Sequence, residues 1–311
     1  MNTEKVAPKP ARSRRVLKAL AVVVPVLLLV GYFAVGAVAA IQLTLPRRDF
    51  SPTVPHRTPS VPYQDVRFPA RGGDVQIAGW YIPRQGSSRV VLMVHGKDDN
   101  RAQEFDGAFV DLASDLQRNG FAVLMIDLRG HGESGDGRFS FGLNERRDIE
   151  GAVDWLKGNG FTAGGIGLLG VSMGGASAIG AAADEPAVGA LVVDSAFADF
   201  CTLLQVRWGE SSGLPDFFIP SALIASRLLF GIDECAARPE TEIGRIAPRP
   251  VLLIFSTTDD LIPRSQAQQL KAAAPFAEVW EATGPRHARI YQADPPAYTA
   301  KVTAFFTRSL K

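Results

Sequence analysis

The hydrophobic positions follow two patterns along the chain, and the first is an unbroken apolar run near the N-terminus. From Ala19 to Ile41, 23 consecutive residues include none that is charged. At about 1.5 Å per residue, a helix of this length would reach about 34 Å and cross the roughly 30 Å apolar core of a bilayer. We therefore predict a transmembrane helix over residues 19–41.

The second pattern covers residues 63–311 and alternates short apolar runs with stretches at helical spacing. Runs typical of strands are Val75–Ile82, Val90–Val94, Phe121–Ile126, Ile166–Val171, Ala190–Val193, Val251–Phe255 and Ala277–Glu281. Helical spacing recurs around residues 105–116, 149–156, 174–183 and 298–305. This alternation predicts an α/β domain with a doubly wound, mostly parallel sheet.

Two intervals interrupt these patterns. Residues 42–62 hold five prolines, at positions 46, 52, 55, 59 and 62, and we expect an extended tether there because proline lacks the backbone donor that helices and central strands need. Residues 200–249 mix aromatic residues with prolines between two expected strands. We interpret this interval as an inserted helical cap.

The distribution of charge predicts how the apolar run is oriented. Six basic residues precede it within residues 1–18, namely Lys5, Lys9, Arg12, Arg14, Arg15 and Lys18, and three arginines follow it closely. Positive residues favour the cytoplasmic side, so we expect a basic cytoplasmic tail and a domain outside the cytoplasm. The alternative is a cleaved signal peptide and a secreted protein, which residues 37–39 (Ala-Val-Ala) would permit.

Composition removes several classes of function. The net charge is only +1, so no sequence-wide basic surface predicts nucleic-acid binding. The two cysteines, Cys201 and Cys235, form no C-x-x-C motif, and the four histidines are scattered, so no structural metal is predicted. Both cysteines fall in the expected cap, where a disulfide and two free thiols remain alternatives.

The strongest chemical signal is Gly-Val-Ser-Met-Gly at residues 170–174, between an expected strand and a helix of small residues. A sharp turn between strand and helix exposes a serine hydroxyl only if the flanking residues are small. The motif therefore points to Ser172 as a nucleophile in such a turn.

A serine nucleophile needs a base and an acid that orients the base. Among the four histidines only His287 follows both the serine and a candidate acid, whereas His95 is interpreted as a structural brace. Asp259 follows the expected strand 251–255 and is nearer its end than Asp260, so it is preferred as the acid, with Asp260 and Asp194 left as alternatives.

A tetrahedral intermediate also needs donors for its oxyanion. The turn His-Gly-Lys at residues 95–97 follows a strand and can present the backbone N–H of Lys97. It would pair with the N–H of Met173, the residue after the nucleophile.

Together these segments resemble the α/β-hydrolase superfamily over roughly residues 65–311. The motifs are His95-Gly96, Asp127-x-Arg129-Gly130-His131-Gly132-x-Ser134, Gly170-x-Ser172-x-Gly174, Asp259-x-Leu261-Ile262-Pro263 and the late His287. With an N-terminal anchor, the chain is similar to the branch of membrane-tethered esterases and acyl-thioesterases, which includes serine-aminopeptidase-like lipases.

The resemblance implies a Ser172–His287–Asp259 triad, the Met173 and Lys97 amides as oxyanion donors, and no cofactor or metal. It implies hydrolysis of a small-molecule or lipid-like ester or thioester. The alternative is a catalytically silent fold that serves as an extracytoplasmic binding module. Acyl-chain length, the choice between ester, thioester and amide, and the oligomeric state are left open by the sequence.

Overall fold

The computed structural model describes residues 11–48, 54 and 57–311, with the side chains of residues 11–15 excepted. The basic positions Lys5 and Lys9 and the tether prolines Pro52 and Pro55 lie outside the described residues. The chain divides into two compact units. The helical unit combines the segment up to Leu43 with Trp208–Ile232, and the α/β unit comprises Thr44–Arg207 and Asp233–Lys311.

The α/β unit is built on one eight-stranded sheet with the order β1-β2-β4-β3-β5-β6-β7-β8. The strands are β1 (Gln64–Pro69), β2 (Gln76–Ile82), β3 (Val90–Val94), β4 (Ala122–Ile126), β5 (Ile166–Val171), β6 (Val188–Asp194), β7 (Val251–Ser256) and β8 (Glu278–Ala282). β2 pairs antiparallel with both β1 and β4, and all other neighbours are parallel. The predicted α/β class with a mostly parallel sheet is confirmed.

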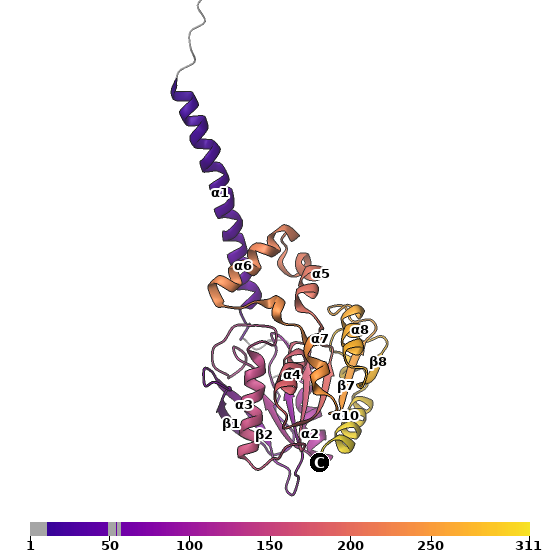
Figure 1. The fold of residues 1–311 in the computed structure, drawn as a ribbon. Coiled ribbons are helices and arrows are strands. Elements are labelled where there is room, and N and C mark those ends of the chain that lie inside the picture. The colour runs from indigo at the N-terminus through magenta and orange to yellow at the C-terminus, as the bar shows by residue number, and fades with distance from the viewer. Residues whose placement is uncertain (1–10, 49–53, 55–56) are drawn as a thin grey trace, which may run out of the picture. The chain divides into compact units, whose positions relative to one another are not determined.

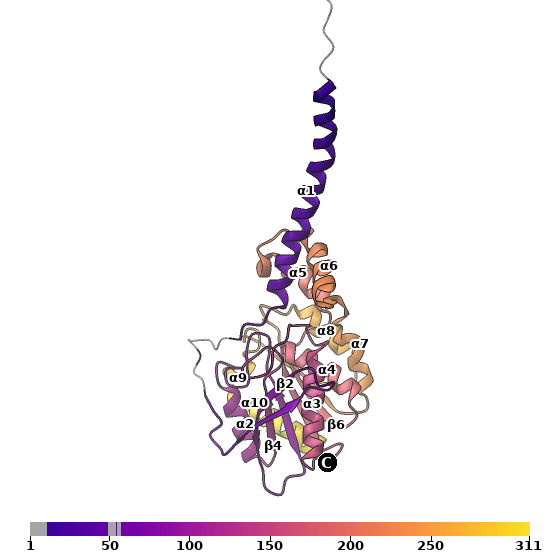
Figure 2. The same ribbon diagram turned by 90° about the vertical axis from the view of Figure 1, so that its left-hand side faces the viewer.

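Helices cover both faces of this sheet (Figures 1 and 2). On one face α2 (Phe109–Arg118) packs against α10 (Pro295–Ser309), which follows the short α9 (Ile290–Ala293). On the other face α3 (Glu145–Gly158) packs against α4 (Met173–Asp184), and α4 contacts α7 (Pro239–Glu242) and η3 (Ile243–Ile246). Next to these lies α8 (Arg264–Ala273).

The central strands β3, β4 and β5 are buried along their whole length. Uninterrupted apolar strands such as Val90–Val94 suit this position, because a parallel sheet covered on both faces offers no polar side. The burial fixes the register of the sheet and aligns the carboxyl ends of the parallel strands at one edge, where open α/β sheets bind their ligands.

The helical unit contains α1 (Ala11–Thr44) up to Leu43, together with η1 (Asp216–Phe218) and α6 (Ile219–Phe230). Among the described residues, α1 is long and apolar enough to cross a membrane over Val16–Thr44, as a membrane anchor or a signal sequence would be. The boundary between the units runs through α5 (Phe200–Ser212), and η2 (Glu234–Ala236) follows where the chain has returned to the α/β unit.

The disulfide left open by the sequence is present. Cys201 and Cys235 are bridged, with their Cα atoms 4.6 Å apart. Both cysteines belong to the α/β unit, on either side of the excursion that enters the helical unit. The bridge therefore ties together the two points at which the chain leaves and re-enters the α/β unit.

Candidate active site

Ser172 lies in the turn between β5 and α4, at the carboxyl edge of the sheet. Its backbone has φ 53° and ψ −119°. L-residues rarely adopt this strained conformation, and it occurs mainly at functional sites. A Cβ added at Gly170 or Gly174 would overlap a neighbouring backbone carbonyl oxygen, so only glycine fits at either position. The local sequence thus produces the sharp turn that exposes the serine hydroxyl.

The loop after β8 brings His287 to this hydroxyl. His287 Nε2 lies 2.9 Å from Ser172 Oγ, and Nδ1 lies 2.8 Å from Asp259 Oδ2. The other oxygen of Asp259 accepts hydrogen bonds from the backbone amides of Leu261 and Ile262. Because Oδ1 is held by two amides, Oδ2 stays directed at the imidazole, and the three side chains form one continuous hydrogen-bonded line.

The two alternative acids have other partners. Asp260 accepts hydrogen bonds from the backbone N–H of His287 and from the Arg286 guanidinium, which hold its pKa below the ordinary value. Asp194 is fully buried and accepts hydrogen bonds from Ser195 Oγ and Tyr298 Oη, each at 2.8 Å. Burial raises the pKa of Asp194 to about 6. Asp260 thus stabilises the loop that carries His287. Asp194 belongs to a separate buried hydrogen-bond network with Ser195 and Tyr298.

The candidate oxyanion donors lie on either side of the nucleophile. Met173 is the first residue of α4, so its amide has no acceptor within the helix. On the other side, a Cβ added to Gly96 would lie 3.2 Å from Ser172 Cβ, so the turn that carries Lys97 passes close to the serine. The Lys97 ammonium itself is paired with Asp98 at 2.5 Å.

Glu104 is a site residue that the sequence analysis missed. Its side chain is buried, and Oε2 accepts a 2.6 Å hydrogen bond from the backbone N–H of Gly96 while Oε1 accepts one from the N–H of Phe105. Burial raises the pKa of Glu104, and burial together with Glu104 raises the pKa of nearby Asp99 to about 8. Glu104 therefore holds the turn that precedes Lys97 in place through its hydrogen bond to Gly96.

His95 and His131 are both buried and face backbone groups. In each ring Nε2 accepts a hydrogen bond from a backbone N–H, of Leu128 for His95 and of Asp98 for His131. Their Nδ1 atoms lie 2.7 Å from Gly96 O and 2.9 Å from Arg129 O. Both rings are therefore neutral with the proton on Nδ1, and burial lowers the pKa of each to about 4. This agrees with the structural role expected for His95.

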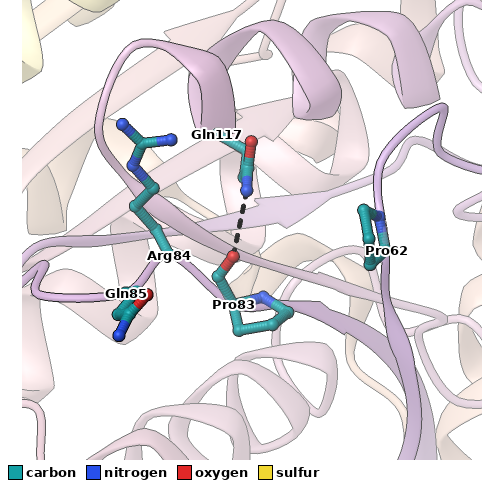
Figure 3. Close-up of a pocket in the computed structure, with 5 residues that line it drawn as sticks. All are labelled: Pro62, Pro83, Arg84, Gln85 and Gln117. Atoms are coloured by element: carbon teal, nitrogen blue, oxygen red, sulfur yellow. Dashed lines mark hydrogen bonds between the residues drawn. The ribbon is translucent and has the colours of Figure 1, made fainter.

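A surface pocket of about 580 Å³ lies away from these residues (Figure 3). It is lined by Pro62, Pro83, Arg84, Gln85 and Gln117, and Gln117 donates a hydrogen bond to the carbonyl of Pro83. The β2–β3 loop that forms it is at the amino edge of the parallel strands, opposite Ser172. Among the described residues, no group of three or more His, Cys, Asp or Glu side chains could hold a metal ion.

The sheet order and the strand–turn–helix around Ser172 define an α/β hydrolase. The chain belongs to the X-Pro dipeptidyl-peptidase (S15) family, a serine hydrolase family whose match covers residues 76–307. It is 30% identical to the uncharacterized protein YqkD of Bacillus subtilis over 236 residues, 74% of each chain. It is 30% identical to the uncharacterized protein Rv2307c of Mycobacterium tuberculosis, covering 80% of this chain and 82% of the relative.

Solved structures agree with this assignment. The Pyrococcus furiosus esterase Pf2001 has a TM-score of 0.69 and 26% identity, covering 86% of this chain and 99% of the esterase. The α/β hydrolase GrgF from Penicillium has a TM-score of 0.63 at 18% identity, which shows the fold alone. The sequence-based resemblance to α/β hydrolases is confirmed.

Proposed function

We propose that this protein is a serine hydrolase that cleaves a carboxylic ester or thioester through an acyl-enzyme at Ser172. His287 Nε2 takes the hydroxyl proton as Ser172 Oγ attacks the carbonyl carbon. The amides of Met173 and Lys97 receive the developing oxyanion, and Asp259 stabilises the imidazolium. His287 then protonates the leaving alcohol or thiol, and water releases the acid by the same route.

The observation that carries this proposal is the line from Asp259 through His287 to Ser172. Both ring nitrogens of His287 lie within hydrogen-bond distance of a side chain, 2.8 Å to Asp259 and 2.9 Å to Ser172. Geometry of this kind is required of a base that must be oriented on one side and transfer a proton on the other. Likeness to an esterase structure supports an ester as the substrate.

Two other functions make different predictions. The match to a family described by X-Pro dipeptidyl-peptidase activity raises peptide hydrolysis as a second candidate. The same fold could also serve as a catalytically silent binding module outside the cytoplasm. A silent module would hydrolyse none of these substrates, and a peptidase would release an N-terminal X-Pro dipeptide.

A substrate panel assayed with the full chain in detergent separates these functions. We expect hydrolysis of p-nitrophenyl esters from acetate to palmitate or of acyl thioesters, and at most slow hydrolysis of an X-Pro p-nitroanilide. Activity should disappear in Ser172→Ala and persist in Ser88→Ala, a matched control at an exposed serine. Turnover of the anilide alone would identify a peptidase, and folded protein inactive on every substrate would favour the silent module.

We further propose that α1 is retained as a membrane anchor, with its N-terminus in the cytoplasm and the α/β unit outside. The helix is long and apolar enough to span a bilayer over Val16–Thr44, and six basic residues, from Lys5 to Lys18, precede the uncharged run 19–41. An alkaline phosphatase fused after Lys311 should be active, since this reporter folds only outside the cytoplasm. Inactive reporter would overturn the orientation, and a mature chain that begins near Ile41 would establish a cleaved signal peptide.

A further inference from the structure

The surface of α6 exposes large apolar side chains where a water-soluble helix would carry polar ones. Ile224, Leu228 and Leu229 are 45%, 79% and 56% exposed, and Phe217 in the preceding η1 is 62% exposed. Ile224 and Leu228, four residues apart, share one face of the helix, and Leu229 adds a third exposed apolar side chain beside it. The only charged residues from 216 to 230 are Asp216 and Arg227.

Most of the buried positions of α6 carry small residues. Ala222, Ala225 and Ser226 are buried, together with Ile219 and Ser221. In a soluble protein the larger apolar side chains would occupy the buried face, because each one fully exposed forgoes about 1.5–3 kcal/mol of transfer free energy. On α6 the large apolar side chains are exposed and small ones are buried, which is the reverse of the arrangement expected in water and fits an apolar environment.

This segment packs directly on the C-terminal half of α1 within the helical unit. Tyr32 Oη donates a 2.8 Å hydrogen bond to the Phe217 carbonyl, and its ring stacks on the rings of Phe217 and Phe218. A Cβ added at Gly36 would come within 2.6 Å of Ser221 backbone, so the two helices touch there. Both views show α6 beside the C-terminal end of α1 (Figures 1 and 2).

We propose that α6 and η1 lie in the lipid bilayer beside α1, with Leu228 and Leu229 among the acyl chains. This proposal rests on the proposed anchoring of α1. A helix that packs on the last turns of a spanning helix lies at the boundary between headgroups and acyl chains, where tyrosine is enriched. The exposed apolar side chains of α6 then add to the lipid-facing surface of α1, whose Leu27 and Leu28 are 63% and 70% exposed.

Lipid is favoured over a second protein chain as the occupant because α6 packs on α1, which is long and apolar enough to cross a membrane. The helices Phe200–Ser212 and Asp216–Phe230, bent by 117°, together are apolar enough for a broken span or a re-entrant loop. The single cation of α6, Arg227, is at its last turn, where a long side chain reaches a headgroup.

Arg207 is the last residue of the α/β unit before the chain enters the helical unit. In the α/β unit, Arg207 at the unit boundary donates a 2.9 Å hydrogen bond from Nε to the carbonyl of Leu261, two residues after Asp259. The disulfide between Cys201 and Cys235 joins the two ends of the excursion. The point at which the chain leaves the α/β unit is therefore hydrogen-bonded to the loop that carries Asp259.

Site-directed fluorescence on the full chain tests the proposal. Because both native cysteines are bridged, a single introduced cysteine can be labelled with the environment-sensitive dye NBD. The variants are Leu228→Cys in α6, Leu28→Cys in α1 and Gln85→Cys in the β2–β3 loop, each reconstituted in phosphatidylcholine–phosphatidylglycerol vesicles with and without nitroxide-labelled lipid. Gln85 is exposed at the sheet edge opposite Ser172 and serves as the control.

We expect nitroxide lipid to quench the probes at positions 228 and 28 roughly threefold more than the probe at 85. Quenching at 28 with a water-like, unquenched probe at 228 would overturn the lipid assignment of α6 and leave the anchor intact. An apolar but unquenched probe at 228 would point to a protein partner and also overturn it. No quenching at 28 would remove the anchor, and with it this proposal, without touching the esterase assay. Leu229→Cys repeats the test if Leu228→Cys fails to fold.

Discussion

Three histidines of the α/β unit gather at the carboxyl edge of the sheet, yet they stand in two different kinds of surroundings. His95 and His131 are fully buried, and each accepts a backbone N–H at Nε2. His287 has 17% of its side chain exposed and has side chains at both ring nitrogens. Two rings therefore lock backbone turns, and only the third can exchange a proton with a nucleophile.

The difference shows that the role of a histidine depends on the partner of each ring nitrogen. A ring nitrogen that accepts from an amide cannot also take a proton without placing two donors against each other. Burial has the same effect, because it lowers the pKa of His95 and His131 to about 4. A base for the nucleophile must avoid both constraints, and His287 does.

The largest loss of activity is expected when Ser172 or His287 is removed from the hydrogen-bonded triad. Ser172→Ala and His287→Ala should each lower kcat by about 10⁴-fold or more, because members of such a unit act together. The double variant should lose no more than either single one, which steady-state assays on the best ester of the panel will measure. Additive losses would mean that the two residues act independently.

The choice of acid comes next. Asp259→Asn should lower kcat by about 10³–10⁴-fold, because an amide cannot hold the histidine in the required tautomer. Asp260→Asn, the neighbouring matched control, should stay within about tenfold of the wild type, since its oxygens contact the loop backbone and Arg286. The reverse ranking would move the acid to Asp260, and two nearly active variants would move it to Asp194.

A smaller loss is expected at Glu104, which we treat as a positioning residue for the Gly96–Lys97 turn. Glu104→Ala leaves the buried N–H of Gly96 without an acceptor and should lower kcat by about 10–100-fold with little change in KM. Glu104→Gln restores an acceptor oxygen and should recover most of the rate. Equal losses in both variants, accompanied by equal falls in Tm, would show a structural role only.

Much of this arrangement could be predicted from local sequence, because strand, turn and helix signals around Ser172 depend on neighbouring residues. Strand β1 was not predicted, because its residues Gln64–Pro69 are mostly exposed at the sheet edge and show no apolar run. Helix α2 begins at Phe109 rather than near Phe105, because Phe105 and Asp106 adopt positive φ. Apolar spacing does not report such a turn.

Contacts between distant segments were harder to foresee. Glu104 reaches Gly96 through a folded loop, and no motif marks a carboxylate that accepts from a turn eight residues earlier. The pairing of Cys201 with Cys235 needed a Cα separation that only the fold provides. For the acid, the order of residues along the chain left three candidate aspartates. In the fold only the carboxylate of Asp259 points to the His287 ring, and those of Asp260 and Asp194 have other partners.

The smallest expected effect is on stability and not on rate, and it concerns His131, one of the two buried histidines. The unfolded chain binds protons at His131 below about pH 6.5, and the folded chain only below about 4, so unfolding is favoured as the pH falls through this window. The shift in the pKa of His131 changes the free energy of unfolding by about 3 kcal/mol at most. Asp148 and Asp194, whose pKa values burial raises to about 6, act in the opposite direction.

The comparison of a variant with the wild type isolates the histidine. His131→Gln can still donate to Arg129 O and accept from the Asp98 amide, and it cannot titrate. Urea unfolding of the full chain in detergent at pH 4.5 and 6.5 should show a smaller loss of unfolding free energy for the variant. An unchanged difference between the two pH values would mean that His131 is protonated in the folded chain.

Covalent labelling tests most directly whether Ser172 is the activated nucleophile. A fluorophosphonate probe reacts with a serine only when a base removes its proton, so the folded full chain should be labelled at one site. Mass spectrometry of the digested adduct should place the label on the peptide that contains Ser172, and labelling should vanish in Ser172→Ala and His287→Ala while Ser88→Ala keeps it. Folded wild-type protein that takes up no probe, or takes it up at another serine, would contradict the account.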